Sequence, residues 1–182
     1  TGHILINLAT VYARQRKFDL AQPYYVRALA IFDATQGRDT GLVGELLRDL
    51  GLAYAAQKKF GLAEPVLART VKYLESAFGP NNPQVALALY NQGYASEFLG
   101  DAPKAGQLYA RALRVWRAQS TPDNARIQAV QQRIDGLVRT SRYAGPSLAL
   151  NLLKPPPGVA MPRQTLKAWH VQLGAYRGYR GA

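Results

Sequence analysis

The feature that most constrains this chain of 182 residues is a segment that recurs at an interval of 42 residues. The first two copies share apolar and small residues along their length, and the third copy is looser. Equivalent positions are Asn7, Asp49 and Asn91; Leu8 and Leu50; Tyr12 and Tyr54; Ala21, Ala63 and Ala105; and Arg27, Arg69 and Arg111. A repeat of this length is typical of solenoids, in which each unit buries its apolar face by stacking on its neighbours.

Each copy contains two stretches with helical periodicity. In the first copy, the apolar residues of the first stretch are Ile4, Leu5, Leu8, Val11 and Tyr12. This spacing predicts an amphipathic helix, and the segment from 20 to 32 predicts a second one. Pro23 and Pro65 are expected near the start of the second helix of their copies, where a missing backbone donor is tolerated.

Small residues occupy three equivalent positions in the copies, which predicts places where two helix backbones approach closely. These positions are Ala9, Gly51 and Gly93; Ala21, Ala63 and Ala105; and Ala28, Thr70 and Ala112.

The pattern resembles the tetratricopeptide repeat in its longer, kinesin-light-chain-like form, over about residues 3–120. The resembling segments are Leu8–Tyr12, Ala21–Leu29 and Gly79–Pro83. Together with the periodicity, the resemblance implies an all-α fold, a right-handed α-solenoid of three helix-turn-helix repeats. We expect these repeats at about residues 1–42, 43–84 and 85–121.

A further helix is expected at residues 122–140, in register with a fourth first helix but without a second helix. Its apolar face carries Ile127, Val130, Ile134, Leu137 and Val138. A helix that covers the last apolar face and turns polar residues outward would cap the solenoid.

The first helices of a solenoid line its concave side, so binding residues are expected about half a turn away from Leu8, Ala9 and Tyr12. This places one amide or carboxylate per repeat in a groove, at Asn7, Asp49 and Asn91. Such groups pair with the backbone of an extended peptide, and the resemblance implies this role for the asparagines. The alternative is that these side chains cap or bridge adjacent helices.

Seven further residues complete the predicted peptide-binding set: Thr10, Arg14, Arg48, Leu52, Tyr90, Tyr94 and Phe98. Arg14 and Arg48 would pair with carboxylates of a ligand, or would be solvated charges. The three aromatic residues form a stripe that either lines the groove or fills space under the cap helix. The residues alone do not decide between these interpretations.

Residues 141–182 differ from the array, because they hold six Lys and Arg and neither Asp nor Glu. Residues 141–166 are expected to be a Pro-rich linker containing Pro155, Pro156 and Pro157. Residues 167–182 are expected to begin a truncated SPOR-like domain. Trp169, Val171 and Leu173 alternate with polar or small residues, which predicts a short strand, and residues 168–176 resemble the opening strand of a SPOR domain. That family implies binding to peptidoglycan in the bacterial periplasm, although a truncated domain would not bind.

Composition and motifs narrow the class of function. The absence of Cys excludes disulfides, thiol catalysis and Cys-ligated zinc, and no run approaches the ~18 apolar residues of a membrane span. No catalytic, phosphate-binding or metal-binding motif is found, so we expect neither an enzyme, a cofactor nor a metal.

The leading prediction is a scaffold that binds an extended peptide or a partner helix in the groove. One alternative is a periplasmic envelope protein that targets peptidoglycan through a SPOR-like domain, with the cytoplasm as the other possible compartment. A net charge of +12 also permits weak nucleic-acid binding, without a motif to favour it. Finally, an exposed apolar face is expected near His3–Leu8, which would promote self-association.

Overall fold

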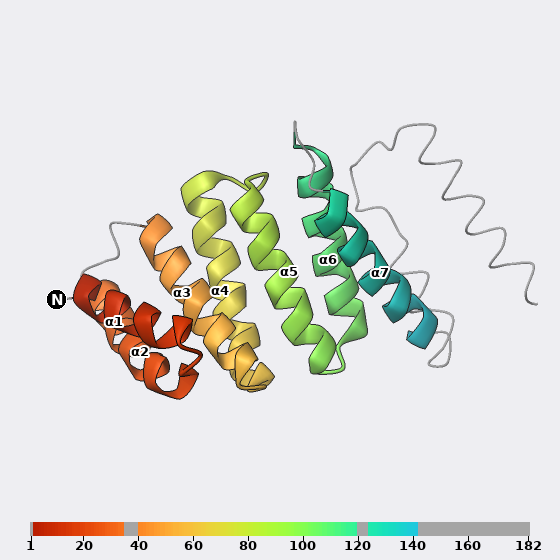
Figure 1. The fold of residues 1–182 in the computed structure, drawn as a ribbon. Coiled ribbons are helices and arrows are strands. Elements are labelled where there is room, and N and C mark those ends of the chain that lie inside the picture. The colour runs from red at the N-terminus through yellow and green to blue at the C-terminus, as the bar shows by residue number, and fades with distance from the viewer. Residues whose placement is uncertain (1, 35–39, 120–123, 142–182) are drawn as a thin grey trace, which may run out of the picture.

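A computed structural model describes residues 2–34, 40–119 and 124–141, which form helices joined by short turns (Figure 1). The helices are α1 (Gly2–Arg14), α2 (Phe18–Ala34), α3 (Thr40–Ala56), α4 (Phe60–Phe78), α5 (Pro83–Phe98), α6 (Ala102–Arg117) and α7 (Asn124–Ser141). The described part of the chain contains no strand. The prediction of an all-α helical repeat fold is therefore confirmed.

The helices form three antiparallel hairpins, α1/α2, α3/α4 and α5/α6, which stack in chain order and are followed by α7 (Figure 1). Helices that follow one another in the chain pack against each other, from α1 and α2 to α6 and α7. The cap helix was predicted at 122–140, and α7 packs on α6 as that prediction requires. The predicted linker and strand beyond Ser141 lie outside the described residues.

The small residues predicted at close helix approaches are buried in the array. All nine are buried: Ala9, Gly51, Gly93, Ala21, Ala63, Ala105, Ala28, Thr70 and Ala112. At Gly93, a Cβ atom would lie 2.8 Å from the ring of Tyr109 and 3.3 Å from the carbonyl oxygen of Ala105. Small side chains at these positions therefore allow the two helices of a hairpin to pack closely.

The three turns within hairpins share one backbone motif. Arg16, Lys58 and Gly100 all have a left-handed backbone, with φ of 60°, 59° and 82°. Each turn closes two hydrogen bonds onto the preceding helix; the first is closed by the amides of Arg16, to Ala13, and Lys17, to Tyr12. This is the Schellman arrangement, which terminates a helix and satisfies its last carbonyl groups.

Side-chain caps mark the N-terminal ends of α5 and α6. The side chain of Asn82 accepts a hydrogen bond from the amide of Gln84, with Pro83 at the start of α5. Asp101 caps α6 in the same way. Pro23 and Pro65 instead lie inside α2 and α4, because these helices begin at Phe18 and Phe60, earlier than the prolines suggest.

An ion pair between neighbouring hairpins also recurs at the repeat interval. Arg69 of α4 pairs with Asp33 of α2, and Arg111 of α6 pairs with Glu75 of α4. Because both partners shift by 42 residues, the second hairpin stacks on the first in the same register as the third stacks on the second. Within the described residues, no helix is both long enough and apolar enough to cross a membrane.

Candidate peptide-binding groove

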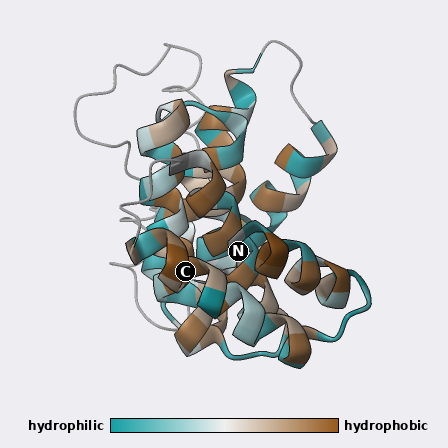
Figure 2. Ribbon diagram, turned by 90° about the vertical axis from the view of Figure 1, so that its left-hand side faces the viewer, coloured by the Kyte–Doolittle hydropathy of each residue, from teal (hydrophilic) through white to brown (hydrophobic). Residues whose placement is uncertain are grey.

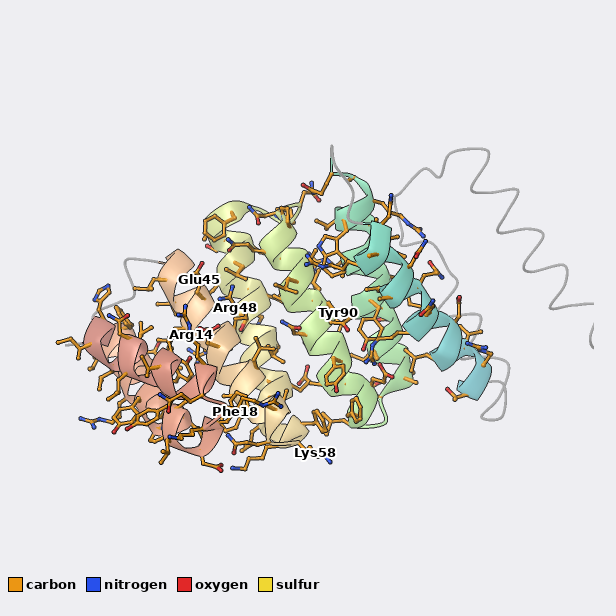
Figure 3. The ribbon with its side chains drawn as sticks, in the orientation of Figure 1. Arg14, Phe18, Glu45, Arg48, Lys58 and Tyr90 are labelled. Atoms are coloured by element: carbon orange, nitrogen blue, oxygen red, sulfur yellow. The ribbon has the colours of Figure 1, made fainter. Side chains whose placement is uncertain are left out.

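The helices predicted to line the groove follow one another along the array. Figure 3 labels Arg14 on α1, Glu45 and Arg48 on α3, and Tyr90 on α5, in succession along the molecule. Arg14 is exposed, whereas Glu45, Arg48 and Tyr90 are half-buried. These first helices therefore present polar and aromatic side chains along the array.

A pocket of about 610 Å³ lies between α5 and α7. Its lining consists of Tyr90, Glu97, Ala129, Gln132, Arg133, Gly136, Leu137 and Thr140. Tyr90 was predicted to line the groove. Four residues of α7 stand one repeat beyond the predicted Tyr90, Asn91, Tyr94 and Phe98, namely Gln132, Arg133, Gly136 and Thr140. Helix α7 thus does more than cap the array, because it forms the second wall of this α5–α7 pocket.

Glu97 and Arg133, which both line the α5–α7 pocket, belong to a network of charged and polar side chains. Glu97 Oε2 accepts hydrogen bonds from Tyr109 Oη at 2.6 Å and from Arg133 Nη1 at 2.8 Å. The Arg133 guanidinium also lies 4.8 Å from the ring centre of Tyr94. Burial, together with the hydrogen bond to Glu97, raises the pKa of Tyr109 well above its ordinary value. The network joins α5, α6 and α7, and it keeps Tyr109 as a hydrogen-bond donor.

The sequence analysis did not single out Arg133 as a groove residue, because the polar residues of the cap helix were expected to face outward. The repeat interval could have identified it, since Arg133 stands one repeat beyond Asn91. The series of polar groups along the first helices is therefore Asn7, Asp49, Asn91 and Arg133.

The predicted groove residues of the first two repeats differ in their exposure to solvent and in their contacts. Asn7 and Arg14 are exposed, and Leu52 is 40% exposed. Arg48 and Asp49 instead pair with each other, with 3.1 Å between Arg48 Nη2 and Asp49 Oδ1. A ligand would have to compete with this ion pair for either side chain.

Thr10 forms a hydrogen bond with Tyr25, which is buried in the core of the first hairpin. Burial raises the pKa of Tyr25, and a hydrogen bond with Thr10 partly opposes this rise. Thr10 is itself half-buried. Its hydroxyl is therefore engaged within the first hairpin.

The aromatic stripe divides between the two roles that the sequence left open. The half-buried Tyr90 packs against Tyr109 and Trp116, with ring centres 5.5 and 6.1 Å apart, and it also lines the pocket. Phe98 is 54% exposed and stacks on Phe60 at 4.7 Å. Tyr94 contacts Phe98 at 4.7 Å and lies beneath Arg133. Tyr90 thus fills space under α7, whereas Phe98 is open to solvent. The predicted Asn91 lies on the same helix and is half-buried.

The chemistry of this surface is that of recognition. Its side chains offer amides, a guanidinium, hydroxyls and aromatic rings, which bind through hydrogen bonds and apolar contact. The described residues contain no group of three His, Asp or Glu side chains able to hold a metal ion.

Comparison with known proteins finds a family model that matches part of the chain. Residues 1–76 match the tetratricopeptide repeat family model. Tetratricopeptide repeats generally mediate protein–protein interactions. No curated protein sequence matches the chain.

Among solved structures, the chain is similar to BtubC (BKLC) from P. vanneervenii, with a TM-score of 0.71 and 19% identity. The similarity covers 88% of this chain and 68% of that one. At this identity the likeness establishes the helical repeat fold alone. The resemblance of residues 167–182 to a SPOR domain remains a prediction, because those residues lie outside the described part.

Proposed function

We propose that the chain is a non-catalytic scaffold that binds a segment of a partner protein along its first helices, with the α5–α7 pocket as the main anchor. The match of residues 1–76 to tetratricopeptide repeats supports a role in protein–protein interaction. The observation that carries the proposal is the pocket itself, which is lined by side chains of α5 and α7.

An extended peptide fits this surface better than a partner helix does. Half-buried Asn91 offers both a donor and an acceptor, which suits a peptide backbone that exposes N–H and C=O groups along its length. Gly136 and Ala129 leave room in the pocket for one side chain of the peptide, and Tyr90 and Leu137 supply apolar walls. The exposed Asn7 and Arg14 would extend the contact toward α1.

The proposal can be tested by selecting peptides from a random library displayed on phage, with the full chain as the target. Affinities of the selected peptides are then measured for the variants Gly136→Phe and Asn91→Ala. A Cβ atom at Gly136 meets no other atom within 4 Å, so a phenylalanine enters the pocket without displacing the core. We expect Gly136→Phe to weaken binding at least tenfold, or about 1.4 kcal/mol.

Asn91→Ala removes hydrogen bonds worth about 1 kcal/mol, so we expect several-fold weaker binding. The matched control is Gly61→Phe, because Gly61 also has open space beyond its Cα and does not line the pocket. If the selected peptides bind Gly136→Phe and Asn91→Ala as tightly as they bind the wild type and the control, the binding site is not at the α5–α7 pocket. Failure to select any peptide would count against peptide recognition itself.

A further inference from the structure

The turns within the three hairpins lie along one edge of the array, the lower edge in Figure 1. We call residues 15–20, 57–62 and 98–101 the hairpin-turn edge. The first two turns present four exposed cations, Arg16, Lys17, Lys58 and Lys59. The same two segments contain a single acid, Asp19, which is 3.8 Å from Lys59. The third turn adds one acid, Asp101, and no cation, so the edge as a whole carries two more cations than acids.

Exposed apolar side chains accompany these cations. Leu20 and Leu62, which are equivalent in the repeat, are 50% and 52% exposed, and Phe98 and Leu99 of the third turn are 54% and 51% exposed. Figure 3 shows the labelled Phe18 and Lys58 at this edge, away from Arg48 and Tyr90. Cations and large apolar side chains thus share one edge, which overlaps the predicted peptide-binding set at Phe98.

Two of the cations occupy backbone positions that disfavour a side chain. Arg16 and Lys58 have φ near +60°, a conformation that glycine adopts without steric cost and that Gly100 adopts in the third turn. A backbone that disfavours a side chain yet carries a basic one in two of three turns points to a use for the side chain.

We propose that the hairpin-turn edge binds the surface of a membrane that contains anionic lipids. In this arrangement, the Lys and Arg side chains would contact lipid phosphates, while Leu20, Leu62 and Leu99 would enter the boundary between headgroups and acyl chains. Anionic headgroups complement the excess of cations at the edge. A nucleic acid would satisfy the cations but would leave the exposed leucines in water, so the membrane surface accounts for more of the edge. The central part of the groove would stay accessible, because Arg48 and Tyr90 lie away from this edge (Figure 3).

The test measures sedimentation of the full chain with vesicles of phosphatidylcholine, with and without phosphatidylglycerol. We expect binding only to the vesicles with phosphatidylglycerol, and release at high salt. The variant Arg16→Gly/Lys58→Gly should weaken partitioning about 25-fold, from about fivefold for each cation. Glycine fits the left-handed backbone at both positions, so loss of binding would not reflect misfolding, and thermal unfolding checks this.

Leu20→Gln/Leu62→Gln should weaken partitioning several-fold while leaving its dependence on salt in place, because the cations remain. The matched charge control is Lys72→Gln/Arg114→Gln, two exposed cations at equivalent positions of α4 and α6. It should change partitioning less than about twofold, since charges beyond a Debye length from the surface are screened. Arg16→Gly/Lys58→Gly keeps every cation outside the edge, and Lys72→Gln/Arg114→Gln keeps every cation of the edge, so both variants lose the same net charge.

Three results would overturn the proposal: no binding to anionic vesicles, equal binding to neutral vesicles, or unchanged binding by Arg16→Gly/Lys58→Gly. Binding to polyuridylic acid that this variant loses, without vesicle binding, would assign the edge to nucleic acid instead.

Discussion

At the scale of single residues, two glycines in similar helices should respond in opposite ways to a methyl group. Gly93→Ala places a Cβ 2.8 Å from the buried Tyr109 ring and 3.3 Å from a backbone oxygen, so we expect destabilisation of about 1–3 kcal/mol. Gly136→Ala meets open space, and we expect a gain of about 0.5–1 kcal/mol because alanine favours the helix. Urea unfolding of both variants measures the two changes. Equal stabilities would mean that the α5/α6 packing is looser than the structure shows.

The sequence predicted some of these residue roles and missed others. Small residues in three registers predicted close helix approaches, because a constraint on the backbone recurs in every copy. The pairing of Asp49 with Arg48 was not predicted, since it depends on the rotamers of two neighbouring side chains. Asn7, Asp49 and Asn91 share a register in the sequence, yet their surroundings differ. The repeat therefore determines where a residue lies on its helix, but not which side chain it contacts.

At the scale of the helices, the sequence predicted which segments are helical but not the polar contacts between them. Gln92 is a polar side chain on the buried face of α5. It is buried because its Nε2 donates to Glu64 Oε1 of α4 at 2.8 Å, and Lys104 of α6 pairs with the same oxygen at 2.8 Å. These partners lie on three different helices, so no periodicity within one helix could have revealed them.

This network should make the stability depend on pH. Burial alone would raise the pKa of Glu64, but hydrogen bonds from Gln92 and Lys104, with the charge of Lys104, hold it below its usual 4.5. A lowered pKa in the folded state stabilises the protein above pH 4.5, and the contribution is lost as the pH falls through the folded-state pKa. The stability advantage of wild type over Glu64→Gln should therefore be largest near neutral pH and shrink in acid.

Urea unfolding of both proteins over this pH range checks the expectation. Lys104→Gln removes one cause of the lowered pKa, so its stability should depend on pH less than that of the wild type. Curves for the wild type and Glu64→Gln that stay parallel into acid would contradict the assignment.

At the scale of the whole molecule, the fixed interval predicted the order and stacking of the hairpins. The α5–α7 pocket was not predicted, because its volume depends on how α7 crosses the preceding helices. Arg133 shows the limit of the periodic argument. Its register placed it with Asn91, but its contacts with Glu97 and Tyr94 follow from the packing of α7.

The first hairpin has an apolar outer face, as the sequence predicted near His3–Leu8. Ile4 is 70% exposed, Leu8 36% and Val11 51%, whereas the equivalent Leu46, Leu50 and Ala53 of α3 are nearly inaccessible to solvent. Figure 2 views the array from the side of the first hairpin, and brown stretches of ribbon face the viewer there. Positions that are buried in α3 are thus open to water in α1, on which no helix packs from outside within the described residues.

This face should cause the chain to associate with itself at high concentration. Sedimentation equilibrium of the wild type should show a mass that rises with concentration, because association buries apolar surface worth about 25 cal/mol per Å². Ile4→Lys/Val11→Lys should weaken association more than about tenfold, since it would bury two charges. Leu52→Lys/Phe78→Lys adds the same charge at side chains that are 40% and 45% exposed elsewhere. If both variants lose association equally, net charge rather than the outer face of α1 controls it, whereas a wild type that stays monomeric removes the apolar face as a contact surface.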